Sequence, residues 1–364
     1  MADTDRMLYI GTSVGLFAAR PGGGGTCPIE PRGLSGELVG AILVDRDDPR
    51  RVFAGTRTSG VYRSDDGGAT WREASRGIVY REVWSMAQAS NGDLYAGTQP
   101  PAVYKSTDGG ETWAGCPSFQ ELEESLFWTF PRAPHIAHIK NLHARPDDPR
   151  WVYGAVEEGW VVRTTDGGQT WQTLKQGVAF DAHAVVTVPG QPSVVIATSG
   201  GGVFRSENYG ETWQKSDAGI QAGPTGGGYM SPLAVHPDRP NVLFAAAAEV
   251  PPPFWSTRPQ GANAFFYRSD DGGRIWRKLQ GPGLPQAGLK PGPRCCVVDP
   301  RDPDAVYFGL ADGSLYATHD GGASFARVVE GLPGWIAAIQ VGYPSAAPGQ
   351  VQLAAAAAAR NGPD

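Results

Sequence analysis

Three histidines have a spacing that could bind a transition metal. His135 and His138 are separated by two residues, and His183 follows Asp181 in an Asp-x-His pair. Neutral imidazole nitrogens bind zinc, copper, iron and nickel, and three of them beside an open position are typical of a catalytic metal site. The sequence therefore predicts a divalent transition metal at His135, His138 and His183. The alternative is that these rings are hydrogen-bonded within the protein, with no metal and no other cofactor.

Acidic side chains offer a second kind of chemistry. A glycoside hydrolase uses two carboxyl groups that flank the scissile bond, and Glu82, Glu157 and Asp181 supply candidate catalytic pairs. Their separations depend on the fold, so the sequence leaves open whether the protein is an enzyme.

A third set of residues combines arginines with aromatic rings. A guanidinium group can hold a carboxylate through two parallel hydrogen bonds, and an indole ring can stack on a sugar or another planar ligand. The candidates for ligand binding are Arg57, Trp84, Trp128, Trp255, Arg294 and Trp335. They predict binding of a small polar molecule or glycan, or of a protein partner. The alternative is that the aromatic rings pack on each other and cover the mouth of the channel, without binding a ligand.

These candidates are far apart in sequence, and a repeated octet indicates how they could meet. Its form is Ser/Thr-x-Asp-x-Gly-x-Thr-Trp, as in Ser106 to Trp113, and each copy follows a short apolar run. Six copies indicate a repeat protein in which the octet joins two strands of a hairpin. The third position is occupied by Asp66, Asp108, Asp166, Asn208, Asp271 and Asp320. We expect these side chains to have a structural role, accepting hydrogen bonds within the turn, because an amide at Asn208 could do the same.

The octet resembles the Asp-box (BNR) motif of β-propellers. The chain is similar to the sialidase-like, sortilin-like and photosystem-assembly-factor-like propellers, and the resemblance extends over nearly the whole sequence. A sialidase-like activity would require an arginine triad, an Asp acid/base and a Tyr–Glu nucleophile pair. Tyr229 with Glu157 is a loose match for that pair, and there is no Arg-Ile-Pro motif near the N-terminus. The resemblance therefore indicates fold more strongly than function.

The resemblance and the repeats predict an all-β chain, a single propeller over residues 1–364. Seven apolar runs can serve as innermost strands, so we expect seven four-stranded antiparallel blades, with six or eight as alternatives. The last run should pair with the N-terminal strands in one blade and close the ring. Insertions at 114–136 and 249–263 should lie on the face opposite the Asp boxes, which makes that face the expected functional one. Residues 351–364 form a possible C-terminal tail.

The composition makes nucleic acid and membranes unexpected as partners. The net charge is −6, with no long basic run, so nucleic acid is not an expected partner. No stretch is long and apolar enough to span a membrane, and the N-terminus has no apolar signal segment. The four cysteines include no CxxC pair. A reduced, cytoplasmic protein is the expectation.

Overall fold

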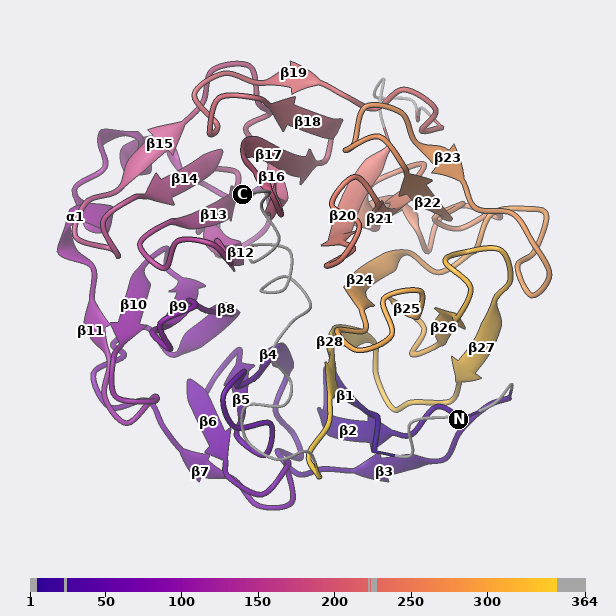
Figure 1. The fold of residues 1–364 in the computed structure, drawn as a ribbon, viewed down its shortest axis with the longest axis horizontal. Coiled ribbons are helices and arrows are strands. Elements are labelled where there is room, and N and C mark those ends of the chain that lie inside the picture. Colours follow the sequence, from indigo (N-terminus) through magenta and orange to yellow (C-terminus); the bar gives the residue numbers. More distant parts are fainter. Residues whose placement is uncertain (1–4, 23–24, 222, 224–227, 346–364) are drawn as a thin grey trace, which may run out of the picture.

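Seven antiparallel sheets surround a central axis in a computed structural model that describes residues 5–22, 25–221, 223 and 228–345 (Figure 1). Each sheet has four strands, as the repeats predicted. The innermost strands are β4 (Val39–Val44), β8 (Glu82–Gln88), β12 (His138–Ala144), β16 (Ala182–Val188), β20 (Tyr229–Val235), β24 (Pro293–Val298) and β28 (Ile336–Gly342). Consecutive innermost strands contact each other all the way round, from β4 through β28 and back to β4.

The outer strands follow the same order in every blade. The second strands are β5 (Val52–Thr56), β9 (Leu94–Gln99), β13 (Val152–Glu157), β17 (Gln191–Ser199), β21 (Leu243–Ala248), β25 (Val306–Leu310) and β1 (Met7–Thr12). The third strands are β6 (Val61–Ser64), β10 (Val103–Ser106), β14 (Val161–Thr164), β18 (Gly202–Ser206), β22 (Phe265–Ser269), β26 (Leu315–Thr318) and β2 (Gly15–Ala19). The short fourth strands are β7 (Arg72–Glu73), β11 (Ala114–Gly115), β15 (Gln172–Leu174), β19 (Gln214–Lys215), β23 (Arg277–Lys278), β27 (Ala326–Val329) and β3 (Ile29–Pro31).

Both ends of the chain build the blade that closes the ring. Strand β28 pairs with β1, and Leu8 and Ile10 lie opposite Val341 and Ile339. All four side chains are buried in one apolar cluster. The predicted closure and the count of seven blades are thus confirmed, because the N-terminal and C-terminal strands pair with each other in one blade.

Each Asp box is a turn whose polar groups bond to one another. In the second copy the Ser106 hydroxyl lies 2.8 Å from Asp108 Oδ1, which also accepts from the Thr112 N–H at 2.9 Å. The Thr112 hydroxyl donates to Asp108 Oδ2, and Gly110 adopts a φ of +84° that a side chain would resist. In the fourth copy, the Asn208 amide donates to the Thr212 hydroxyl at 2.9 Å. The polar groups of these turns are therefore used within the turns themselves.

A second repeated contact, which the sequence analysis did not identify, joins neighbouring blades. The N–H of Trp113 donates to the carbonyl of Arg76 in the preceding blade at 2.8 Å. Gly77 has a φ of +98°, and a Cβ there would lie only 1.9 Å from the Trp113 carbonyl oxygen. The same pair of contacts recurs for Gly177 with Trp213, Gly219 with Trp276, and Gly283 with Phe325. At these four junctions a glycine is therefore required where a blade receives the aromatic residue of the next Asp box.

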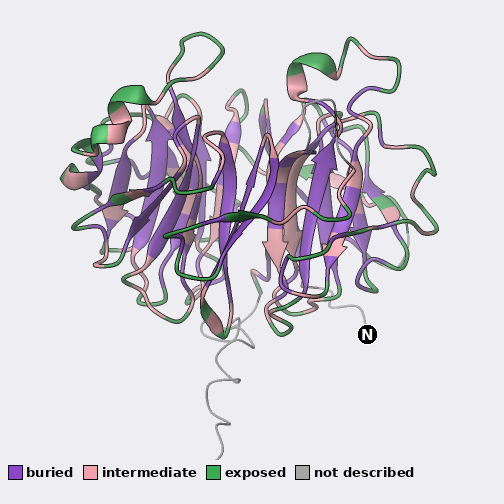
Figure 2. Cartoon of the chain, turned by 90° about the horizontal axis from the view of Figure 1, so that it is seen from above, coloured by how far each residue is buried: buried purple, intermediate pink, exposed green. Residues whose placement is uncertain are grey.

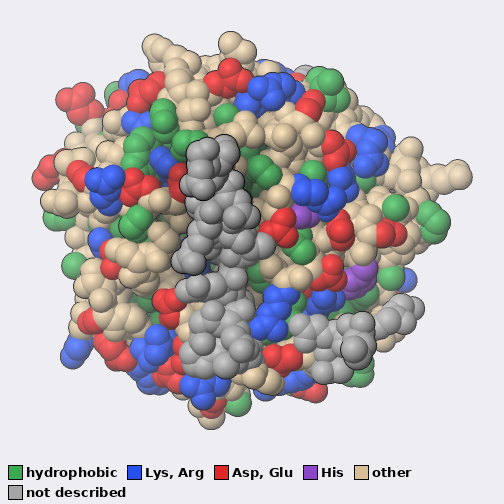
Figure 3. Space-filling view, in the orientation of Figure 1, with side chains coloured by type: hydrophobic (Ala, Val, Ile, Leu, Met, Phe, Trp, Pro, Cys, Tyr) green, Lys and Arg blue, Asp and Glu red, His purple; other side chains and the backbone are tan. Residues whose placement is uncertain are grey.

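Both insertions project from one face of the disc, at the upper edge of Figure 2. The only helices in the described residues lie within them: α1 (Pro117–Gln120), η1 (Glu123–Phe127) and η2 (Pro252–Phe254). The first insertion is shorter than expected, because Ala114 and Gly115 pair with β10 as the fourth strand β11. The opposite face shows acidic and basic side chains interspersed (Figure 3). The possible tail at 351–364 lies outside the described residues.

The Asp boxes are expected to contribute to acid denaturation. Hydrogen bonds from Thr112 lower the pKa of Asp108 to about 2. At Asp66 and Asp320 burial acts in the opposite direction, but hydrogen bonds within the turn outweigh it, and their pKa values are also about 2. Because these folded-state pKa values lie below the unfolded value of about 3.9, their stabilisation is complete above pH ~4 and is lost as the pH falls through ~2.

We therefore expect the melting temperature of the natural sequence to fall more steeply between pH 4 and pH 2 than that of a variant carrying Asp66→Asn, Asp108→Asn and Asp320→Asn. Asn208 shows that an amide can occupy this position. Thermal melts at a series of pH values measure the effect. Identical slopes would show that these carboxylates do not couple to folding.

Candidate functional site

A cavity of about 730 Å³ occupies the central channel on the insertion side of the disc. All seven innermost strands or the loops beside them contribute to its wall, and Phe130, Arg132 and Trp255 reach it from the two insertions. Arg57, Trp84, Arg294 and Trp335, which the sequence proposed for ligand binding, also line it. So do Glu82, Glu157, Asp181, His183 and Tyr229. The fold thus brings most of the three candidate sets to one place.

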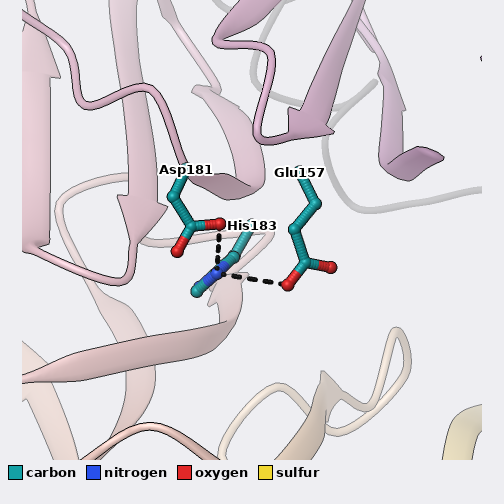
Figure 4. Close-up of side chains that lie close together, drawn as sticks. All are labelled: Glu157, Asp181 and His183. Carbon is teal, nitrogen blue, oxygen red and sulfur yellow. Dashed lines mark hydrogen bonds and ion pairs between the residues drawn. The ribbon is translucent and has the colours of Figure 1, made fainter. Parts of the chain in front are cut away.

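Three candidates lie elsewhere. Trp128 packs against Phe119, with ring centroids 5.6 Å apart, and does not line the cavity. His135 is exposed, and its Nδ1 bonds to the carbonyl of Phe130 at 3.0 Å. His138 is fully buried behind the wall, where its ring stacks on Trp84. Within the described residues, the geometry that could hold a metal is a different set, Glu157, Asp181 and His183 (Figure 4).

A β-bulge in the innermost strands decides which residue enters the cavity. Three residues are left without a paired residue on the second strand of their blade: Trp84 in β8, Lys140 in β12 and His183 in β16. The unpaired residue in β4 is Gly40, and in β24 it is Arg294. All five line the cavity. A bulge re-aims one side chain without disturbing the rest of the strand, so the propeller presents a different chemical group from each blade on one scaffold.

One side of the cavity is basic. Arg57 lies over the indole of Trp84, 3.2 Å from the ring centroid, and its Nη1 donates to the Val83 carbonyl at 3.3 Å. Burial lowers the pKa of Arg57 to about 9, so the group is still cationic at neutral pH. The bulge residue Gly40 leaves room for it, because a Cβ there would lie 2.7 Å from the Arg57 Cζ.

Arg294 lies beside two rings on the same side. Its Cζ is 5.1 Å from the ring centroid of Trp255 and 4.7 Å from that of Trp335. Burial lowers its pKa as well, and its buried Nε has no hydrogen-bond acceptor. Among the described residues, no carboxylate lies within ion-pair distance of Arg57 or Arg294. The two guanidinium groups therefore face the cavity without an ion pair to a carboxylate, and Glu157 acts on both, and Glu82 on Arg57, only at longer range.

The acidic groups of the cavity come from three consecutive blades. Glu157 accepts from Lys140 Nζ and from His138 Nε2, each at 2.7 Å. Burial alone would raise the pKa of Glu157, but Lys140 and His138 outweigh it and hold that pKa well below its usual range. Burial lowers the pKa of His138 to about 4, so its ring is a neutral donor to Glu157. Burial also raises the pKa of Glu82, which accepts from Trp84 Nε1 at 3.1 Å.

Sequence reasoning placed Lys140 near the channel mouth but did not identify its contact with Glu157 or the orientation of Arg57 against Trp84. A break in the alternation of inward and outward residues along each innermost strand is the signal that would have found the bulges. That break is visible only when the strands are aligned blade by blade.

Comparisons with known proteins agree with this fold. A family model described as sortilin, neurotensin receptor 3, matches residues 159–282. A curated xyloglucanase from a Paenibacillus species is 28% identical over 358 residues, covering 86% of this chain and 27% of the xyloglucanase. The chain therefore spans about a quarter of the length of that relative. No helix in the described residues has the length and apolarity needed to cross a membrane.

Solved structures show the same architecture at low identity. An ancestral GH74 enzyme has a TM-score of 0.61 at 19% identity, over 91% of this chain and 39% of that one. The GH74 xyloglucanase from Xanthomonas campestris has a TM-score of 0.60 at 16% identity, over 88% of this chain and 46% of the xyloglucanase. YCF48 from Cyanidioschyzon merolae has a TM-score of 0.53 at 16% identity, over 80% of this chain and 84% of YCF48. With its repeated turns and closed ring, the chain is a seven-bladed β-propeller with Asp boxes, similar to sortilin, xyloglucanase and YCF48 propellers.

Proposed function

We propose that this protein binds a small acidic carbohydrate, such as a uronic acid, in the central cavity. The observation that carries the proposal is the pair of half-buried guanidinium groups, Arg57 and Arg294, neither of which forms an ion pair with a carboxylate of the described residues. Removing part of a cation's hydration without an ion pair is costly, and a ligand carboxylate would offset that cost through charge-assisted hydrogen bonds.

The opposite wall supports a ligand rich in hydroxyl groups. Asp181 offers carboxyl oxygens on that side, and Tyr229 adds aromatic surface. A carboxylate at one end and hydroxyl donors at the other would match both walls at once. The xyloglucanase similarity agrees with a carbohydrate, since that relative acts on a glycan by its name, although this chain spans only about a quarter of it.

Isothermal titration calorimetry with glucuronate and galacturonate tests the proposal, with glucose and galactose as the matched neutral sugars and EDTA in every buffer. We expect saturable binding of at least one acidic sugar, and much weaker binding of its neutral counterpart. Equal affinities for acidic and neutral sugars, or no binding of either acid, would contradict the role of the two arginines. Binding of an acidic peptide in their place would favour a protein partner, as in the solved complex of YCF48 with a D1 peptide.

A glycoside hydrolase is the second candidate, because two carboxylates lie close together in the cavity wall. A carboxylate oxygen of Glu157 and one of Asp181 lie within 4.8 Å of each other. Retaining glycosidases separate their two carboxyl groups by about 5–5.5 Å. Against this role, Lys140 and His138 already engage both oxygens of Glu157. Reducing-end assays on xyloglucan oligosaccharides decide the question: turnover that disappears in Asp181→Asn would establish a hydrolase.

A further inference from the structure

The ring of His183 is held in one tautomer by the backbone. Its Nδ1 bonds to the carbonyl oxygen of Met230, and a carbonyl can only accept, so Nδ1 carries the hydrogen. In the neutral ring, Nε2 then presents a lone pair. That nitrogen lies 3.0 Å from Asp181 Oδ1 and 3.6 Å from a Glu157 oxygen, and Figure 4 shows both carboxylates directed at it. Three groups that all accept therefore converge on one point.

Lys140 already supplies a positive charge to Glu157, and a further positive species at His183 Nε2 would offset the repulsion that remains. That species is either a second proton on the ring or a metal cation. Ligand atoms that are each about 2.1 Å from one metal ion lie roughly 3.0–3.5 Å apart, which is close to the two measured separations. A histidine that binds a metal through one nitrogen commonly donates from the other to a backbone carbonyl, as His183 does to Met230.

We infer that His183 Nε2, Asp181 and Glu157 form a binding site for a divalent transition metal in the wall of the central cavity. The site goes beyond the sugar-binding proposal and does not depend on it. It differs from the histidine set expected from sequence, since only His183 is common to both. Imidazole suits zinc and carboxylates suit manganese, so both metals are candidates.

The charges of the neighbouring groups show that a proton on His183 would compete with a metal ion for this site. Lys140 donates to the same Glu157 oxygen that faces His183, and His138 donates to the other. A carboxylate oxygen has two lone pairs, so the bond from Lys140 leaves one for a metal. The two carboxylates and Lys140 together carry one net negative charge, which a ring proton would neutralise and a divalent ion would reverse. Metal binding must therefore be measured against protonation of His183.

The test uses full-length protein without a histidine tag, dialysed against EDTA and then freed of chelator, and no sugar. Isothermal titration calorimetry with Zn²⁺ and, separately, Mn²⁺ compares the natural sequence with His183→Gln and Asp181→Asn. His319→Gln is the matched control, because His319 is exposed within an Asp-box turn. We expect one site for at least one metal in the natural sequence and the control. Loss of a ligand should weaken it by at least about 100-fold, the upper end for losing an outer-shell partner.

A second measurement covers the case in which His183→Gln does not fold. Nuclear magnetic resonance of protein labelled with ¹⁵N-histidine reports the state of His183 Nε2 directly. A change at Nε2 on adding the metal, with His319 unaffected, supports the site. A doubly protonated His183 that does not respond to either metal, or titrations that are the same in both ligand variants and the control, would overturn it. Sugar binding is measured with EDTA present, so the two proposals can fail separately.

Discussion

Replacing Arg57 and Arg294 together by methionine is expected to weaken binding of an acidic sugar by at least about 100-fold. Each hydrogen bond to a charged group contributes about 1.5–3 kcal/mol, and 1.4 kcal/mol corresponds to tenfold in affinity. Methionine is an unbranched apolar side chain that can fill part of the same space, while it removes the guanidinium groups that lie over Trp84 and Trp335. Affinity for the matched neutral sugar should change little. Calorimetric titration of both sugars measures the difference.

The stability of this double variant should not fall with its affinity. Burial lowers the pKa of Arg57 to about 9, so the folded protein disfavours this charge relative to the unfolded chain. Removing the charge should therefore leave the melting temperature unchanged or raise it, even with the contact to Trp84 weakened. A residue whose loss costs affinity but not stability is retained for function. Arg81→Gln is the control, because Arg81 is an exposed partner of Glu73 that does not line the cavity. If the double variant instead unfolds and its folded fraction binds normally, the arginines are structural.

Gly77→Ala is expected to destabilise the protein by about 2–5 kcal/mol. A side chain at the φ of +98° costs about 1–2 kcal/mol, and forcing an atom into a filled space adds about 1–3 kcal/mol. The added Cβ would lie 1.9 Å from the Trp113 carbonyl oxygen, so the two blades would have to separate. Their separation would also strain the hydrogen bond from Trp113 to Arg76. Urea denaturation gives the free energy of unfolding.

Gly331→Ala separates the two causes. Gly331 has a φ of +74°, but nothing lies within 4 Å of the position of its Cβ. This variant should therefore show only the backbone cost, about 1–2 kcal/mol. If Gly77→Ala and Gly331→Ala are equally destabilising, the contact between blades does not contribute, and the glycine is needed only for its φ.

The sequence by itself determined the repeat and the type of strand connection, and it favoured seven blades over six or eight. These follow from local chemistry: Asp108, Gly110 and Thr112 bond within a single turn, and the same octet recurs six times. The alternating apolar runs then specify strands, and the unmatched run at the C-terminus specifies ring closure. Most candidates for the cavity wall could also be predicted, because innermost strands begin at the mouth of the channel.

Only the tertiary structure decided which of these side chains meet. Blade by blade, the bulges align His183 with Lys140 and Trp84, whereas His138 precedes the bulge in β12. The two histidines therefore occupy different positions in their blades. His138 stacks behind Trp84, while His183 faces Asp181 and Glu157. A one-residue shift reverses the direction of a side chain on a strand, and bulges depend on pairing between strands, so a linear pattern could not place the two rings.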